Sequence, residues 1–363
     1  MPVMNAPAPR VGIPLRPDRN AVDREWRRGF VRGATAIVLA KLQKSSAVAI
    51  QKANWANDRT AELVVRGAVT PTTQDAYPGA SVSRLLLLAP RSAAAQLAPL
   101  ATTVDLAGIS NFSFPLPTNF ADAGFIAEGA PIPLRQGTYQ GFSIGPVRKL
   151  ALLAALSGEL ENASGGIAET IIDYTLSVAV GRGLDAVLFG SADATDDAPA
   201  GLLFGVVPIA GSADMANDLG ALISAIAAAG IDTASVVFVC ASAQALALQL
   251  AAGPHFTKRI IEASTLASGT VIAVAAAGFV IAGDGAIPTV DISKQAVLHF
   301  ADPASPIAPA GGPISAPVIS TFQNDLVALR CTARICWSAA PGSVAVVTGA
   351  TWGNSAASKQ EAA

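Results

Sequence analysis

The sequence predicts an α+β protein organised around one long extended segment and one long helix. Between Pro115 and Gly145 there is no helical period, yet Phe, Ile, Tyr and Pro are mixed there with few charges. Apolar side chains then recur at helical spacing from Ile167 to Phe189, beginning with Ile167, Ile171, Tyr174 and Val178. About 23 residues at 1.5 Å each make a rod of about 35 Å. Helices and strands alternate through the rest of the chain, without evident internal repeats. A structureless loop this long is unusual in a compact domain and is typical of a functional element.

The N-terminal segment is predicted to be a helical arm. Residues 1–17 are rich in Pro and Ala, and an approximate helical stripe begins at Arg19 and continues in pieces to Val65. Gly29 and Gly33 weaken this helix. Its apolar content is too thin for a core of its own, so we interpret it as an arm rather than a domain.

The arm is basic and the remainder is acidic. Residues 1–66 hold twelve of the 24 Lys and Arg but only five acids, whereas the rest holds twelve bases and twenty-one acids. Three interpretations stay open: contact between arm and body of neighbouring subunits, an arm facing nucleic acid, and a solvated helix with surplus arginine.

The extended segment is too long to fold back on its own body. Folded as a hairpin, residues 118–145 give two arms that reach roughly 45 Å at about 3.3 Å per residue. A compact body of about 290 residues has a radius of gyration of only about 19 Å. An isolated hairpin is marginal in water, so we expect this one to lie on another surface, that of a neighbouring subunit.

The C-terminal half is predicted from apolar runs and turn residues. Helices are expected at 217–229 and 244–252, and a strand buried on both faces at 235–240. Further strands are expected at 201–209 (with a turn), 271–281, 296–300, 325–337 and 343–348.

The composition predicts extensive buried surface without a membrane span. Hydrophobic residues make up 52%, charged residues only 14%, and the mean hydropathy is +0.47. The best apolar run, Thr270 to Gly283, is shorter than a membrane span and is broken by glycine. Residues 1–17 show no signal-peptide pattern. We therefore expect a protein that hides surface in subunit contacts.

Metal and cofactor sites are not expected. Three cysteines without CxxC spacing and only two histidines do not make a structural zinc site. Cys331 and Cys336 would point to opposite faces of one strand, so we expect buried free thiols. The acids Asp193, Asp196 and Asp197 are expected to form a solvated turn, since they lack the EF-hand pattern.

One motif suggests catalysis. Gly141-Phe-Ser-Ile-Gly145 fits the nucleophile elbow of serine hydrolases, with Asp291 and His299 downstream in hydrolase order. The elbow requires a helix directly after the serine, but here Pro146 and an apolar, strand-like run follow. We therefore favour a β arm softened by glycine and expect no enzyme.

Several segments together resemble a known family. They are Glu128-Gly129-x-x-Ile132-Pro133, Val147-Arg148-Lys149, Ser157-Gly-Glu-Leu160, the long helix, Gly190…Pro199-Ala-Gly201 and Phe322 to Arg330. The chain resembles the major capsid proteins of tailed bacteriophages, which have the Hong Kong 97-like fold. The resemblance implies an N-terminal arm, an extended β-hairpin loop, a long spine helix, and peripheral and axial domains.

The resemblance also implies domain boundaries. They are an N-terminal arm at 1–78, peripheral domain at 79–110, extended loop at 111–147, peripheral domain with the spine helix at 148–214, axial domain at 215–318, and returning strands with the tail at 319–363.

The function implied is that of a shell subunit. Such a protein would assemble with itself as pentamers and hexamers around non-specific double-stranded DNA, in the cytoplasm of a bacterial host, and end in the virion capsid. Portal protein is an expected partner, with scaffolding and decoration proteins as further ones, and no membrane. Contact candidates between subunits are Phe120, Phe125, Ile126, Glu128, Ile132, Arg135, Tyr139, Phe142, Arg148, Lys149 and Glu159.

One departure from the family pattern bears on how the shell is held. Some members crosslink their subunits covalently through a lysine of the extended loop, but residues 118–145 contain no lysine. We therefore expect non-covalent contacts. The alternatives are an encapsulin-like compartment of the same fold, holding protein cargo, and a serine hydrolase.

Overall fold

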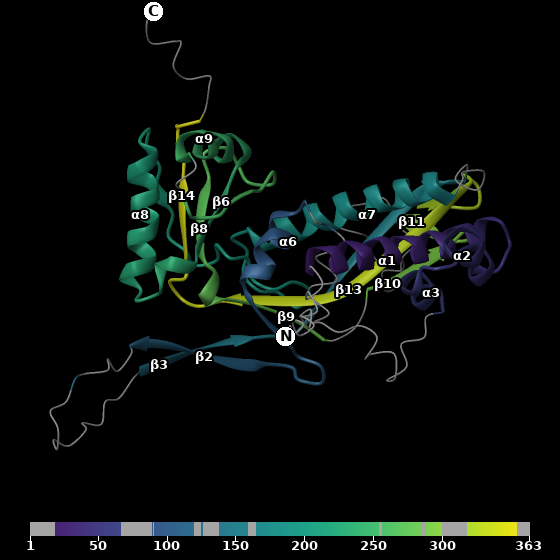
Figure 1. Cartoon of the computed structure of the whole chain (residues 1–363), viewed down its shortest axis with the longest axis horizontal. Coiled ribbons are helices and arrows are strands. Elements are labelled where there is room, and N and C mark those ends of the chain that lie inside the picture. Colours follow the sequence, from purple (N-terminus) through teal and green to yellow (C-terminus); the bar gives the residue numbers. More distant parts are fainter. Residues whose placement is uncertain are drawn as a thin grey trace, which may run out of the picture.

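The computed structural model describes residues 19–66, 89, 91–119, 125, 138–158, 165–253, 256–284, 288–299 and 318–353. These residues form an elongated lobe, a compact lobe at one end of it, and a two-stranded ribbon that leaves the body (Figure 1). Helices and strands are mixed in both lobes, so the predicted α+β class is confirmed.

The sheet of the long lobe is built on one long strand, β13 (Leu326–Ala339). Strand β4 (Arg148–Ser157) runs antiparallel along one side of it. On the other side β13 pairs first with β10 (Thr289–Ser293) and then with β9 (Phe279–Gly283). Strand β1 (Thr102–Asp105) continues this sheet, parallel to β9.

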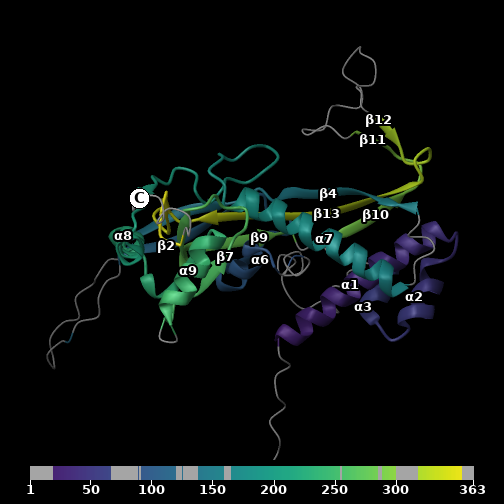
Figure 2. The same cartoon turned by 90° about the horizontal axis from the view of Figure 1, so that it is seen from above.

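Two long helices lie side by side over one face of this sheet (Figure 2). They are α7 (Gly165–Leu188), the predicted long helix, and α1 (Arg19–Leu42). Apolar residues of α1, α7 and β13 form one buried cluster, which includes Leu39, Ile172 and Leu329. The N-terminal helices thus have no core of their own, as expected, but they are part of the long lobe's core.

Two glycines of α1 allow a second layer of helices. The short helices α2 (Ala47–Trp55) and α3 (Arg59–Arg66) fold back on α1. A Cβ at Gly29 would lie 2.4 Å from Thr60 Cβ, and one at Gly33 would lie 2.5 Å from Val64 Cβ. These glycines weaken the isolated helix, but they let α3 approach it closely.

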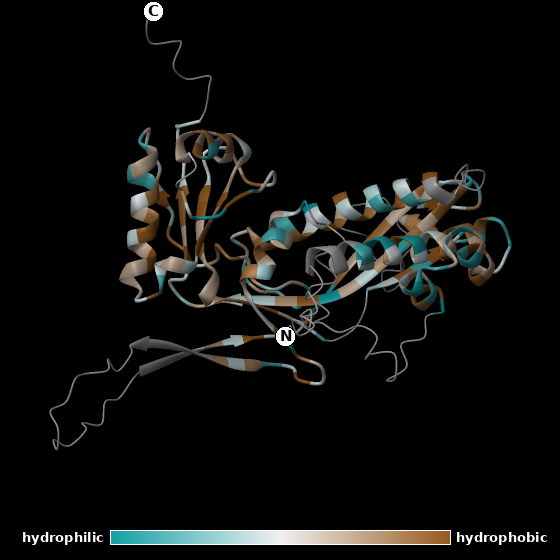
Figure 3. Cartoon of the chain, viewed as in Figure 1, coloured by the Kyte–Doolittle hydropathy of each residue, from teal (hydrophilic) through white to brown (hydrophobic). Residues whose placement is uncertain are grey.

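The compact lobe is a second five-stranded sheet with helices on one face. Helices α8 (Met215–Ala228) and α9 (Ser242–Ala252) share one buried cluster with the strands. Its strands are apolar along their length in the hydropathy view (Figure 3). The strand order is β5 (Ile209–Ala210), β14 (Val344–Thr348), β8 (Val271–Ala275), β6 (Val236–Cys240) and β7 (Ile260–Glu262).

The single strand predicted at 271–281 is wrong. The chain leaves β8, passes through a 3-10 turn at Ala276–Gly278, and enters β9 in the other sheet. Both strands are completely buried, so the apolar run carries no sign of the break between them. The predicted strand at 201–209 is a turn with only β5 at its end, and β10 was not predicted.

Because β14 lies in the compact lobe while β9 and β10 lie in the long lobe, the sheets cross the predicted boundary at 318. The remaining elements are short: α6 (Ala93–Leu97), the 3-10 turns Ala98–Leu100 and Thr233–Ser235, and the pair β11 (Val297–His299) with β12 (Val318–Ser320).

Two buried carboxylates fasten separate elements together. Asp185 of α7 accepts hydrogen bonds from Ser92 Oγ (2.6 Å) and from the backbone N–H groups of Ala93 and Ala94, at the start of α6. Asp218 of α8 accepts from Ser212 and, at 2.8 Å, from Trp352 Nε1. Burial alone would raise the pKa of the Asp218 carboxyl, but these hydrogen bonds outweigh it and the pKa lies below its usual value.

The three cysteines are buried free thiols, as predicted. Burial raises the pKa of Cys240 to about 12 and those of Cys331 and Cys336 to about 11. Cys331 faces the α7 cluster and Cys336 the opposite cluster, which confirms that they point to different faces of β13. Within the described residues, no helix combines the length and the apolar character needed to cross a membrane.

Candidate subunit interface

The predicted extended segment begins as a two-stranded antiparallel ribbon. Strand β2 (Phe112–Asn119) pairs with β3 (Thr138–Ile144), from Phe112 opposite Ile144 to Asn119 opposite Thr138. The predicted hairpin is therefore present, and its pairing starts at residue 112 rather than 118.

The root of this ribbon is anchored in its own chain. Phe142 and Ile144 are buried among residues of β9 and β13, such as Val280 and Cys336. The Phe114 ring packs on the Phe142 ring, with centroids 5.6 Å apart. Phe142 was predicted to contact a neighbour, but its ring lies in the core of its own chain because β3 crosses the sheet there. We leave it out of the proposed interface.

Beyond its root the ribbon runs as a separate element below the compact lobe in the view of Figure 1. Within the described part of the chain, β2 and β3 pair only with each other. Phe125, the single residue described in the segment that joins the two strands, has a fully exposed side chain. The connecting segment therefore exposes at least one aromatic side chain to solvent.

Helix α7 carries two apolar stripes, and only one of them is buried. Ala168, Ile172 and Leu176 begin the buried stripe, which faces the sheet and α1. The second stripe, which we call the open α7 stripe, consists of Ile167, Ile171, Tyr174 and Val178, with exposed fractions of 57%, 40%, 67% and 39%. The sequence predicted these four residues at helical spacing, but not that a second stripe would occupy the core.

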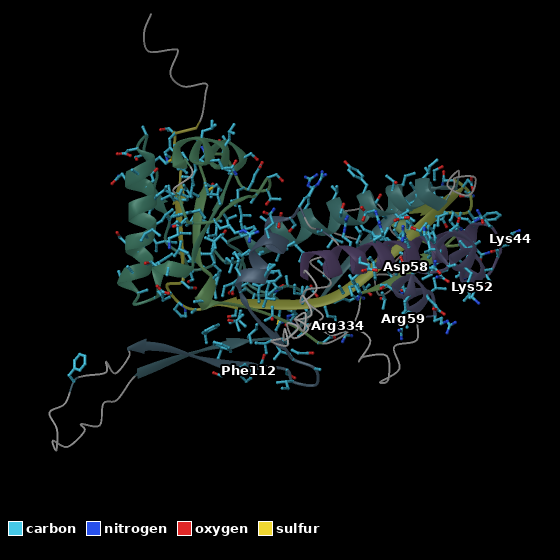
Figure 4. All side chains as sticks on the ribbon, in the orientation of Figure 1. Lys44, Lys52, Asp58, Arg59, Phe112 and Arg334 are labelled. Atoms are coloured by element: carbon cyan, nitrogen blue, oxygen red, sulfur yellow. The ribbon has the colours of Figure 1, made fainter. Side chains whose placement is uncertain are left out.

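The outer face of the sheet, opposite α7, combines apolar and charged residues. Along β4 every second side chain is exposed, and Leu153 among them is 56% exposed. On β13, Arg330 forms an ion pair with Asp291 at 2.7 Å, and Arg334 one with Asp284 at 3.0 Å. Figure 4 shows Arg334 on this face. Leu153 carried no sequence signal that set it apart from its half-buried neighbours on the strand.

Two of the predicted charged contacts lie on β4. Lys149 is exposed and lies across from Arg334, while Arg148 is half-buried and lies across from Ile335. Neither forms an ion pair with a described residue. Tyr139 lies in β3 opposite Pro117, with its side chain outside the described residues. Also outside them are Phe120, Ile126, Glu128, Ile132, Arg135 and Glu159.

The basic arm and the acidic body do meet, but within one chain. Arg27 of α1 bonds both carboxylate oxygens of Asp173 on α7, at 2.6 and 2.8 Å. Arg32 lies 3.1 Å from Asp58 and 3.4 Å from Glu169. Part of the charge asymmetry in the sequence is thus used to hold α1 on α7.

The serine motif does not form a nucleophile elbow. Ser143 lies inside β3, opposite Ser113, and the chain continues into β4 rather than a helix. Asp291 is engaged by Arg330 in another sheet, and His299 ends β11. A hollow of about 370 Å³ beside Trp337 is lined by apolar side chains and backbone, with Ser338 as its only polar side chain. Among the described residues no metal-binding cluster of His, Cys, Asp and Glu is present.

No family model and no curated protein matches this sequence. Among solved structures it is similar to a chain of Mycobacterium phage Bobi, at 17% identity and a TM-score of 0.46, covering 71% of this chain and 90% of that one. A chain of Microbacterium phage Oxtober96 has 16% identity and a TM-score of 0.47, covering 69% and 89%. A chain described as the capsid of an empty GTA particle has 16% identity and a TM-score of 0.43, covering 72% and 90%.

The elements of the chain itself follow the expected order: helical arm, protruding β-hairpin, long helix, and a body of two lobes.

Proposed function

We propose that this chain is the subunit of an icosahedral capsid that self-assembles around double-stranded DNA through non-covalent contacts. The observation that carries the proposal is the open α7 stripe together with the protruding ribbon. The open α7 stripe is an apolar helix face without a partner among the described residues, and the ribbon is an extended element that pairs there only with itself and exposes Phe112 at its start.

The energetics favour association through these surfaces. Ile167, Ile171, Tyr174 and Val178 lie on one flank of a helix whose other flank already packs on α1. Burying apolar area stabilises a complex by about 25 cal/mol per Å². Four such side chains, repeated at every subunit of a closed shell, add up to a large driving force, although each contact is small.

We infer that the occupant of the open α7 stripe is the ribbon of a second copy. The ribbon's paired strands alone, eight residues at about 3.3 Å each, extend roughly 26 Å. Its root is fixed in its own body, so the remainder reaches outward. In a ring of subunits each ribbon would then lie on the next α7, a head-to-tail contact that closes into pentamers and hexamers.

Charged residues would set the register of this contact. Lys149 and Arg148 of β4 are the described members of the proposed set, with Glu128, Arg135 and Glu159 as the others. Exposed ion pairs contribute little individually, so their role is orientation rather than affinity.

The remaining parts follow from the same proposal. The long lobe would be the peripheral domain and the compact lobe the axial domain, with the boundaries predicted above adjusted for β9, β10 and β14. Portal, scaffolding and decoration proteins would be the partners of this chain during assembly in the bacterial cytoplasm. The assembled chain would then form part of the virion.

The test is particle formation by the full chain, measured by light scattering and electron microscopy. Wild type is expected to form monodisperse shells that contain nucleic acid. An Ile171→Glu, Tyr174→Glu variant is expected to stay at 36.5 kDa with an unchanged unfolding temperature, because both side chains are exposed in the free subunit. Val207→Glu, at an exposed apolar residue (83%) outside α7 and the ribbon, is the control and should still assemble.

Three results would count against the proposal. A wild type that remains a monomer overturns the shell, and protein cargo without nucleic acid favours an encapsulin-like compartment. Boiled particles that run as a ladder of multimers on a denaturing gel would contradict non-covalent assembly.

A further inference from the structure

The free end of the N-terminal helices carries positive charge that no described acid neutralises. Lys41, Lys44, Lys52 and Arg59 are all exposed, and none makes an ion pair or hydrogen bond through its side chain to a described residue. We call these four residues the basic tip. Figure 4 shows Lys44, Lys52 and Arg59 along this end of the molecule.

The two acids of α3 and of the turn before it are already engaged. Asp58 lies 3.1 Å from Arg32, and its other oxygen accepts the backbone N–H of Ala61. Glu62 pairs with Arg66 one helical turn away. Lys294 Nζ, from the sheet, donates to the carbonyl of Leu42 at 3.2 Å and so holds the end of α1 in place.

Lys44 occupies a position where the backbone does not favour a lysine. Its φ is +51°, in the left-handed region where glycine, or asparagine, is the favoured residue. The side chain is exposed and makes no ion pair with a described residue, so a salt bridge within the described chain does not explain its presence. Residues held in such conformations cluster at functional positions.

We propose that the basic tip binds the phosphate backbone of double-stranded DNA, without sequence preference. The proposal deepens the proposed function by naming the element that contacts the enclosed DNA, and in that respect it rests on it. Duplex DNA carries one charge per about 1.7 Å, and each lysine or arginine on a phosphate releases counterions. The four charges follow one another from the last turn of α1 through the α1–α2 turn and α2 to the first residue of α3, which suits a row of phosphates.

The main rival is an acidic surface of a second copy. Asp193, Asp196 and Asp197 are exposed in one loop. This loop places three negative charges within five residues, whereas the four charges of the basic tip are spread from α1 through α2 to α3. The loop could therefore pair with only part of the basic tip. Other acids, such as Asp173 and Asp291, are already paired within their own chain.

The experiment measures binding of the full chain to two labelled duplexes of unrelated sequence, by fluorescence anisotropy over a salt series. The test variant is Lys44→Gly, Lys52→Ala, Arg59→Ala. The control, Arg91→Ala, Arg182→Ala, Arg259→Ala, removes three exposed charges elsewhere. Affinity falls with salt, so the slope of log affinity against log salt is negative. Its magnitude should be smaller by about 3 in the test variant, equally for both duplexes, and remain near the wild-type value in the control.

Lys44→Gly alone separates binding from folding. Glycine is favoured at φ +51°, so the unfolding temperature should stay equal or rise while the salt slope falls by about 1. An unchanged slope in the triple variant, or the same loss in the control, would overturn the proposal.

Particle formation is followed in the same preparations. If wild type forms no particles but the salt slopes behave as expected, the shell proposal fails and DNA binding by the basic tip stands. If the triple variant binds DNA like wild type but no longer assembles, the tip is a contact between subunits, and the inference about DNA is wrong.

Discussion

The chain has two extensions, and the structure treats them in opposite ways. The N-terminal helices are built into the core of the long lobe, where Phe30, Ala34, Val38 and Leu42 are all completely buried. The β2–β3 ribbon is buried only at its root, through Phe142 and Ile144, and then leaves the body. Both segments looked like arms in the sequence.

The difference lies in the repeat of the apolar side chains. The four buried residues of α1 recur every fourth position, and α7 offers a matching stripe beginning at Ala168 and Ile172. Two helices with such stripes can pack along their whole length. The ribbon has no comparable repeat beyond its root, so its own body offers it no surface. An extension stays with its chain when a complementary stripe exists there.

The largest expected effect tests this contrast with one aromatic ring from each extension. Phe30→Ala removes a completely buried ring that stacks on Trp26 and should lower the free energy of unfolding by about 3–5 kcal/mol. Phe125→Ala removes a fully exposed ring and should change it by less than about 0.5 kcal/mol. Urea unfolding of unassembled subunits measures both, and similar losses in the two variants would refute the contrast.

Much of the fold could be predicted from periodicity, and the exceptions have physical reasons. The long helix, the hairpin and the strands at 235–240 and 325–337 follow from apolar repeats and turn residues. The break between β8 and β9 could not be predicted, because both strands are buried and the intervening Ala-Ala-Gly is as apolar as they are.

The candidate interface was predicted only in part. Ile167, Ile171, Tyr174 and Val178 were recognised as a stripe, but the sequence cannot say which of two stripes on one helix faces the core. Leu153 resembles any other residue of its strand, and its exposure depends on which side of the sheet α7 covers.

The C-terminal stretch after β14 is a third potential extension, and a buried carboxylate holds it. Asp218→Asn replaces a carboxylate by an amide, which has one acceptor oxygen and cannot accept hydrogen bonds from both Ser212 and Trp352. We expect it to lower the free energy of unfolding by about 2–3 kcal/mol at neutral pH. The pKa of Asp218 is lowered in the folded state, so its contribution is present above the usual value of 3.8 and is lost as the pH falls through the folded pKa.

The pH dependence provides the check on that prediction. The stability difference between wild type and Asp218→Asn, from urea unfolding, should shrink as the pH falls below 3.8. Asp196→Asn, at an exposed acid, is the control and should match wild type throughout. A gap that is constant with pH would show that the ionised carboxylate is not what holds Trp352.

A smaller effect separates packed from open helix surface. Gly33→Ala places a methyl group against Val64 and should destabilise by about 1–2 kcal/mol, although alanine favours helix. Gly183→Ala on α7 meets nothing within 4 Å and should stabilise by up to about 1 kcal/mol. Thermal unfolding would show shifts of opposite sign, and a rise in unfolding temperature for both variants would mean that α3 moves easily to make room for the methyl group.

The smallest expected effect concerns the ion pair that joins the arm to the body. Arg27 and Asp173 are about one-quarter and one-third exposed, and a double-mutant cycle with alanine should give a coupling of about 0.5–1 kcal/mol. The more exposed pair Arg330–Asp291 should give less, and salt should weaken both. A coupling near zero for Arg27–Asp173 would leave the apolar stripes, with the longer Arg32–Glu169 pair, to hold α1 on its own α7. A value well above 1 kcal/mol would mean that the opposite charges of arm and body, visible in the sequence, also select the partner.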